Sequence, residues 1–97
     1  MTLDIILEQL TKQAENVAPL GAKLKFALDD DIIMIDGSGD KNILSTEDGE
    51  ADTTIITSKE TLVKLKSGEL NPMMAVMGGK VKIKGDMGLA MKLQSLL

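Results

Sequence analysis

The spacing of apolar residues predicts an amphipathic helix at the start of the chain. From Leu3 to Val17, apolar side chains recur every three or four positions, and polar side chains fall mostly on the opposite face. Pro19 and Gly21 follow this stretch, and both residue types are typical of the end of a helix. We therefore expect one helix whose apolar side packs on a core.

Four strands are expected next. Residues 22–28 alternate between apolar and polar side chains, as a half-buried strand does. Residues 32–36 are apolar on both faces until Asp36, which indicates a strand covered on both sides. Residues 41–46 and 52–57 complete the set, and the turn sequence EDGE between them predicts that they pair as an antiparallel meander.

Helical signals return after residue 57. Thr57 and Glu60 have the spacing of a capping box, and Ser58 is the competing N-cap. Gly68 is the expected C-terminal stop of this helix.

The last third of the chain predicts a short helix, a strand and a final helix. Asn71-Pro72 is a strong helix start, because Asn caps and Pro fits the first helical position. Residues 80–85 alternate Lys with apolar residues, as a strand does, and Asp86 caps a helix over residues 87–97. The order of elements predicts one α+β domain over residues 1–97, with a five-stranded, mostly antiparallel sheet covered on one face by helices.

The composition excludes several classes of function. The 97 residues include no Cys, His, Trp or Tyr, and Phe26 is the single aromatic residue. A thiolate nucleophile, an imidazole base and a common zinc site are therefore absent, and no metal site or cofactor is expected. The net charge of -4 argues against a nucleic-acid partner. The N-terminus is a poor signal peptide and no apolar run could span a membrane, so we expect a soluble cytoplasmic protein.

The stretch LKSGELNPMMAVMGGKVKIKGDMGLAMKL, residues 65–93, resembles the signature of the sterol carrier protein family, the non-specific lipid-transfer domains. Residues 51–58, ADTTIITS, are similar to the segment that precedes this signature in the family. The matching residues are Gly68, Asn71-Pro72, Ala75, Gly79-Lys80, Lys82-Ile83-Lys84-Gly85, Met87 and Ala90-Met91-Lys92-Leu93. The resemblance implies an apolar tunnel between the sheet and the helices, which binds a fatty acid, a fatty acyl-CoA or a sterol without catalysis.

The methionines near the C-terminus have two interpretations. Met73, Met77, Met87 and Met91 could be ordinary core residues at helical spacing. Alternatively they line a deformable lipid cavity, because unbranched thioether side chains repack around ligands of different shape. The resemblance gives the second interpretation equal weight for Met77, Met87 and Met91. The lipid-binding residues predicted in this way are Leu7, Leu10, Phe26, Ile33, Ile35, Met77, Met87 and Met91.

Lys80, Lys82 and Lys84 form a row that is either a solvated strand face or a weak site for an anionic head group. The expected partners are a fatty acid, an acyl-CoA or another lipid, with transient membrane contact. A homodimer or a lipid-metabolising enzyme is a further possible partner. The alternative function is a protein-interaction or dimerisation module that keeps the fold without a lipid ligand.

Overall fold

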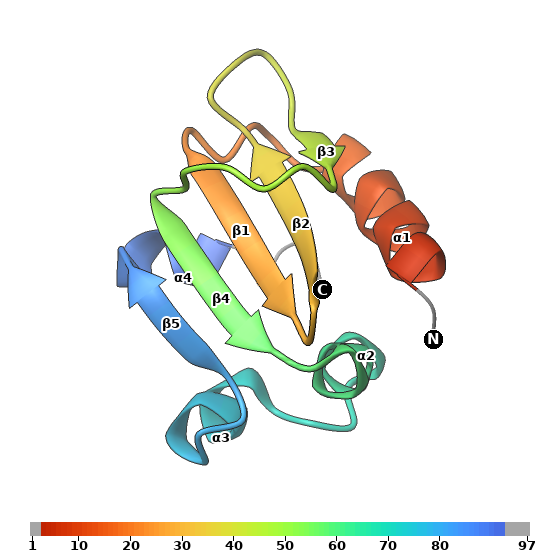
Figure 1. The fold of residues 1–97 in the computed structure, drawn as a ribbon, viewed down its shortest axis with the longest axis vertical. Coiled ribbons are helices and arrows are strands. Elements are labelled where there is room, and N and C mark those ends of the chain that lie inside the picture. Colours follow the sequence, from red (N-terminus) through yellow and green to blue (C-terminus); the bar gives the residue numbers. More distant parts are fainter. Residues whose placement is uncertain (1–2, 93–97) are drawn as a thin grey trace.

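A five-stranded sheet lies at the centre of the computed structural model, which describes residues 3–92 (Figure 1). The elements are α1 (Leu3–Glu15), β1 (Lys23–Leu28), β2 (Asp31–Asp36), β3 (Ile43–Ser45), β4 (Thr53–Thr57), α2 (Lys59–Ser67), α3 (Pro72–Met77), β5 (Lys82–Gly85) and α4 (Met87–Lys92). Every predicted element is therefore present. The part of the last predicted helix that follows Lys92 lies outside the described residues.

The strand order is β3-β2-β1-β4-β5, and every pair is antiparallel except β1 with β4. The predicted pairing of residues 41–46 with 52–57 is wrong, because β4 crosses the sheet and runs parallel to β1 (Figure 1). Contacts with β1 hold this crossover in place. The Lys25 Nζ lies 2.6 Å from the Asp48 carboxylate, and the Asp52 amide donates to the Lys23 carbonyl at 2.8 Å.

The core lies between the sheet and the helices. In β1, Leu24, Phe26 and Leu28 are buried, and the register of the sheet pairs the first two with Ile35 and Ile33 of β2. Alternation then places these side chains on one face, where the apolar side of α1 also packs. The buried residues of α1 are Ile6, Leu10 and Ala14, as its periodicity predicted. On the opposite face of β2, Met34 is also buried.

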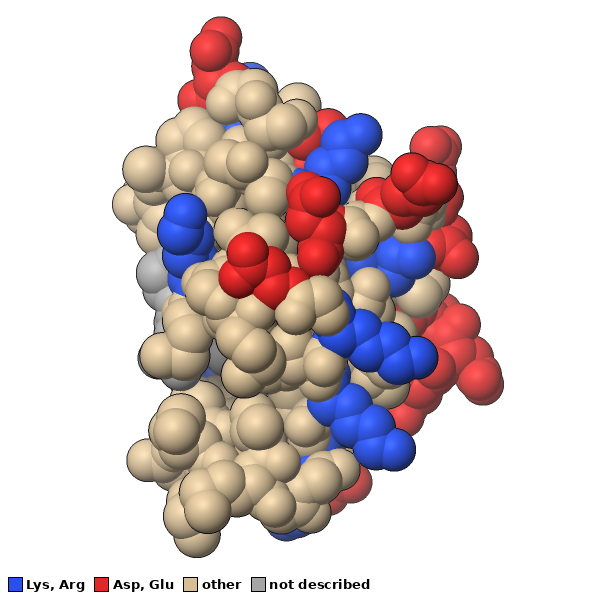
Figure 2. Space-filling model, turned by 90° about the vertical axis from the view of Figure 1, so that its left-hand side faces the viewer, with Lys and Arg blue, Asp and Glu red and all other residues tan. Residues whose placement is uncertain are grey.

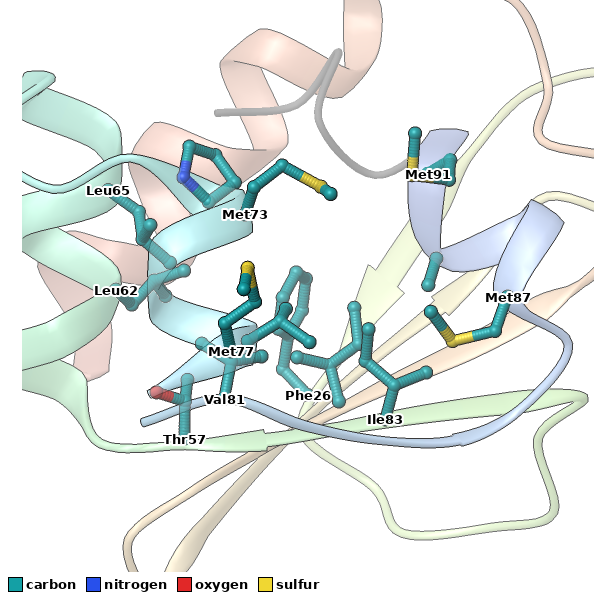
Figure 3. A pocket seen from close by; sticks show the side chains of 14 residues that line it. Phe26, Thr57, Leu62, Leu65, Met73, Met77, Val81, Ile83, Met87 and Met91 are labelled. Atoms are coloured by element: carbon teal, nitrogen blue, oxygen red, sulfur yellow. The ribbon is translucent and has the colours of Figure 1, made fainter. Parts of the chain in front are cut away.

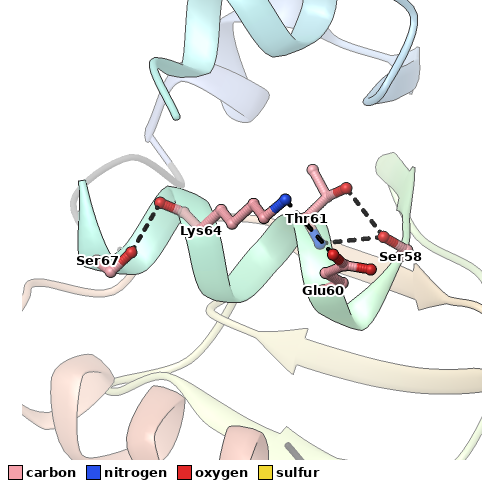
Figure 4. Close-up of polar contacts among 5 residues, drawn as sticks. All are labelled: Ser58, Glu60, Thr61, Lys64 and Ser67. Atoms are coloured by element: carbon pink, nitrogen blue, oxygen red, sulfur yellow. Dashed lines mark hydrogen bonds and ion pairs between the residues drawn. The ribbon is translucent and has the colours of Figure 1, made fainter. Parts of the chain in front are cut away.

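The helix α2 begins at Ser58 and not at Thr57. The Thr61 amide donates to the Ser58 Oγ at 3.0 Å, which satisfies one of the free amides of the first turn (Figure 4). Thr57 is buried instead, and its hydroxyl donates to the Lys80 carbonyl at 2.9 Å. The predicted capping box at Thr57 is therefore wrong, because that side chain ties β4 to the segment that leads into β5.

Three other predicted helix ends are confirmed. Gly68 ends α2 in the left-handed region, with a φ of 82°. The Asn71 side chain accepts from the Met73 amide at 2.9 Å, and the Asp86 carboxylate accepts from the Gly88 amide at 2.7 Å. Within residues 3–92, no helix has the length and apolar character that a membrane crossing needs. Over the same residues, no cluster of three or more His, Cys, Asp or Glu suits a metal ion.

Candidate functional site

An apolar cavity of about 210 Å³ lies between the sheet and the helices α2, α3 and α4 (Figure 3). Phe26, Ile55 and Ile83 come from three neighbouring strands and form its floor, where the register pairs Ile55 with both other residues. Thr57 is the polar member of the described lining, and its hydroxyl donates a hydrogen bond to the Lys80 carbonyl. The remaining lining residues are Leu62, Leu65, Pro72, Met73, Val76, Met77, Val81, Met87, Ala90 and Met91.

Helical spacing brings the walls of the cavity together. Leu62 and Leu65 are three positions apart in α2, so both face the same side of that helix. Met73 and Met77 are four apart in α3, and Met87 and Met91 are four apart in α4. Figure 3 shows these two methionine pairs facing each other across the cavity, one pair from each helix. The cavity can therefore change shape through four unbranched side chains.

The methionines form the mouth of the cavity. Met77 is 80% exposed, Met73 is 58% exposed, and Met87 and Met91 are each 55% exposed, although all four line the cavity. The cavity thus opens to the surface between α3 and α4. Neither helix is deeply anchored: the residue that α3 buries is Ala75, and the residue that α4 buries is Ala90. Few buried apolar contacts are typical of segments that open at low free-energy cost.

The predicted lipid-binding residues fall into two groups. Phe26, Met77, Met87 and Met91 line the cavity together. The others lie in the packed part of the core, outside the cavity lining, and they are Leu7, Leu10, Ile33 and Ile35. Leu7 and Leu10 lie there because α1 lies beside β3 and β2, at the other end of the sheet (Figure 1). Ile33 and Ile35 belong to β2 at that same end. Lipid contact by any of these eight residues stays a prediction.

Several lining residues were missed from the sequence. Leu62 and Leu65 had a usable signal, because both lie on the apolar side of a helix with a clear N-cap. Ile83 also alternates with polar neighbours in its strand, whereas Ile55 is followed by a second apolar residue. The sequence could not show that these residues and Phe26 lie side by side, because strand pairing determines that placement.

The predicted lysine row does not enter the cavity. Lys82 and Lys84 are exposed on the opposite face of β5, and Lys80 precedes the strand. A polar groove of about 530 Å³ lies on that side, lined by Lys64 of α2 together with Lys80 and Lys82. Thr57 lines both the groove and the cavity, so the two adjoin. Lys84 lies outside the described lining of the groove. Lys64 is paired with Glu60 at 3.4 Å on one wall of this groove (Figure 4).

Comparison with known proteins identifies the family. The model of the SCP-2 sterol transfer family matches residues 3–97. Sterol carrier protein 2 of Rattus norvegicus is 48% identical over 59 residues, which make up 61% of this chain and 11% of that protein. Hydroxysteroid dehydrogenase-like protein 2 of Bos taurus is 50% identical over 48 residues, which make up 50% of this chain and 12% of that protein. The chain spans about a tenth of the length of these curated relatives.

Solved structures agree with the family match. The sterol carrier protein domain 2 of Helicoverpa armigera has a TM-score of 0.72 and 32% identity, and the match covers 96% of this chain and 80% of that one. Sterol Carrier Protein 2 Like 2 of Aedes aegypti has a TM-score of 0.75, and the match covers 98% of this chain and 95% of that one. At 19% identity, this second likeness shows the fold alone. With the fold, the signature residues and the family model in agreement, the chain belongs to the SCP-2 sterol transfer family.

Proposed function

We propose that this protein binds the hydrocarbon chain of a fatty acid or fatty acyl-CoA in the methionine-lined cavity and carries or presents it without catalysis. The observation that supports this most strongly is the lining, which is apolar at every described position except Thr57. The Aedes aegypti sterol carrier protein-2, which shares the fold with a TM-score of 0.74, was solved in complex with C16 fatty acid (palmitate). That complex supports a ligand of the same class here.

The cavity must widen to hold a long chain. Its volume of about 210 Å³ is below the roughly 300–1,000 Å³ of typical ligand pockets. The flexible methionine pairs and the shallow anchoring of α3 and α4 allow this widening. Each methylene that leaves water contributes about 0.8 kcal/mol, so we expect a C16 chain to bind more tightly than a C8 chain. Equal affinity for the two chains would contradict this mechanism.

For an acyl-CoA, we propose that the anionic head group lies in the groove of Lys64, Lys80 and Lys82. The groove adjoins the cavity at Thr57, and its three lysines outnumber the two carboxylates in its lining, those of Asp29 and Glu60. We expect Lys80→Gln to weaken binding of palmitoyl-CoA but not of palmitate. The matched control is Lys84→Gln, which removes a lysine outside the groove. Equal losses in both variants would contradict this placement.

Native mass spectrometry before and after delipidation tests the proposed function. We expect the freshly purified protein to retain an adduct of fatty-acid mass. We also expect removal of that adduct to lower the melting temperature, because a ligand stabilises the state that it binds. A clean apo mass, with no thermal shift on addition of palmitate or palmitoyl-CoA, would contradict the proposal. A cytoplasmic location, and delivery to a lipid-metabolising enzyme, complete the proposed function.

The second candidate function is a protein-interaction or dimerisation module without a lipid ligand. The exposure of the methionines around the cavity mouth favours it, because contiguous exposed apolar side chains mark interaction sites. Met87→Glu distinguishes the two functions. It places a carboxylate at the mouth, so lipid uptake is abolished if the cavity binds lipid. A protein that takes up no lipid before the substitution, and loses self-association after it, would instead support the second function.

A further inference from the structure

The two edges of the sheet differ in how they are covered. At one edge, α1 packs against β3 (Figure 1). At the other edge, β5 has no strand on its outer side among the described residues. Figure 2 views the molecule from this side and shows lysine side chains along one margin of it. An uncovered edge strand presents a row of backbone N–H and C=O groups, so it can pair with an added strand.

Hydrogen bonds hold both ends of β5 in place. Thr53 and Thr57 of β4 are the buried polar residues within residues 3–92. The Thr57 hydroxyl donates to the carbonyl of Lys80, before β5, at 2.9 Å. The Thr53 hydroxyl donates to the carbonyl of Asp86, after β5, also at 2.9 Å. The strand is therefore fixed in an extended conformation before a partner binds, which lowers the conformational entropy lost on pairing.

The two faces of β5 differ in chemistry. Ile83 faces the cavity, whereas Lys82 and Lys84 are exposed on the opposite face. Neither lysine takes part in an ion pair within the described part of the chain. The carboxylates of Asp52 and Asp86, beside the last residue of β5, each accept a backbone amide, at 3.0 and 2.7 Å. The two lysine charges are thus available to a partner.

We propose that the outer edge of β5 binds an extended acidic segment of another protein, which adds to the sheet as a further strand. The added strand places acidic side chains beside Lys82 and Lys84, because opposite charges on one face of neighbouring strands attract. Beside Ile83 it places an apolar side chain, on the face toward the helices. The recognised pattern is acidic, apolar, acidic at successive positions. Backbone hydrogen bonds supply the affinity, and the alternating side chains supply the specificity.

A second copy of β5 is a poorer partner for this edge. An antiparallel pair of two β5 strands would place the lysines of one copy opposite the lysines of the other. Like charges directly opposite each other destabilise a strand pair, and lysines on edge strands discourage self-association in this way. The charges that disfavour a second β5 favour an acidic strand. The proposal does not depend on a lipid ligand.

Peptide titrations of the ¹⁵N-labelled chain test the strand addition. We expect a peptide that alternates glutamate with valine to shift the amide signals of Lys82–Gly85. It should bind about tenfold more tightly than a peptide of the same composition whose glutamates are adjacent, because only alternation places every carboxylate on the lysine face. Equal affinity for the two peptides would overturn the proposal, since net charge alone would then explain binding. No binding of the alternating peptide would also overturn it.

N-methylation of single peptide amides tests the backbone pairing. In a strand pair, successive amides of the peptide point alternately toward β5 and away from it. Methylation should therefore weaken binding at every second position and have little effect between them. The same loss at every position, or no loss at any, would overturn strand addition.

Lys84→Glu tests the charge recognition, and Lys41→Glu is the matched control. Lys84 lies outside the lining of the polar groove, so its substitution leaves the proposed head-group site unchanged. Lys41 is exposed between β2 and β3, away from β5. We expect Lys84→Glu to weaken the alternating peptide about threefold or more, because an attractive cross-strand pair becomes repulsive. Equal losses in the two variants would overturn the proposal. A dimer of the chain alone that the alternating peptide dissociates would assign this edge to a second copy and overturn the acidic partner.

Discussion

Leu62→Ala tests whether a bound acyl chain fills the space that the truncated side chain leaves beside the cavity. Leu62 is 1% exposed and forms part of the cavity wall, whereas Leu10 is 0% exposed and lies in the core outside the cavity lining. Truncation of a buried Leu to Ala costs about 2–5 kcal/mol. At roughly 4–8 °C for each kcal/mol in a domain of this size, a loss of about 3 kcal/mol lowers the melting temperature by about 12–24 °C. Both variants should show this loss in the delipidated protein.

Palmitate should restore stability to one variant only. The hole left by Leu62→Ala adjoins the cavity, so the bound acyl chain fills part of it. Two methylene-sized groups transferred from water are worth about 1.6 kcal/mol, at about 0.8 kcal/mol each. The deficit of Leu62→Ala should therefore shrink by about 1–2 kcal/mol at a palmitate concentration well above the Kd. The hole left by Leu10→Ala is out of reach, so its deficit should persist.

The assay is chemical denaturation followed by circular dichroism, with and without palmitate. Circular dichroism is the suitable probe, because the chain contains no Trp or Tyr whose fluorescence could report unfolding. For each substitution, the measured quantity is the difference between the loss of unfolding free energy with palmitate and the loss without it. An equal response of Leu62→Ala and Leu10→Ala to palmitate would refute the reasoning, and so would an unchanged deficit in Leu62→Ala.

Three further predictions concern stability. Ser58→Ala removes the N-cap of α2 and should cost about 1 kcal/mol in thermal denaturation. Gly85→Ala should cost more than about 1 kcal/mol, because Gly85 has a φ of 108° and its backbone packs against β4. Gly39→Ala, in open space, should cost little. The hydrogen bond and charge of Lys25 lower the pKa of Asp48 below 3.8. This stabilisation is present above pH 3.8 and is lost as the pH falls through the folded-state pKa, so denaturation of Asp48→Asn at a series of pH values should show a smaller loss in acid.

Local patterns predicted most of the fold. The caps at Asn71 and Asp86 and the stop at Gly68 are confirmed, because each depends on residues within one turn of helix. The pairing of β4 was not predictable in this way. Its partner depends on a crossover that Lys25 and Asp48 help to fix, and these residues are far apart in the sequence. The family resemblance supplied what local patterns lacked, namely an expectation of an apolar site between the sheet and the helices.

The candidate site was predictable only in part. Phe26, Met77, Met87 and Met91 line the cavity as expected, and the signature stretch contains most of its wall. Leu10 and Ile33 are equally apolar and more deeply buried, yet they lie in the packed core. Apolar periodicity indicates that a side chain is buried. It does not indicate which part of the core is hollow, because that depends on how the helices lie over the sheet.

The central claim is that a lipid chain occupies the methionine-lined cavity. The most direct measurement is a palmitate titration of protein labelled with ¹³C in the methionine methyl groups. We predict that the signals of the four cavity methionines, Met73, Met77, Met87 and Met91, shift together and saturate. The signals of Met34, buried in β2, and Met74, outside the cavity lining, should move little. Unchanged cavity signals, or equal shifts at Met34 and Met74, would contradict the account.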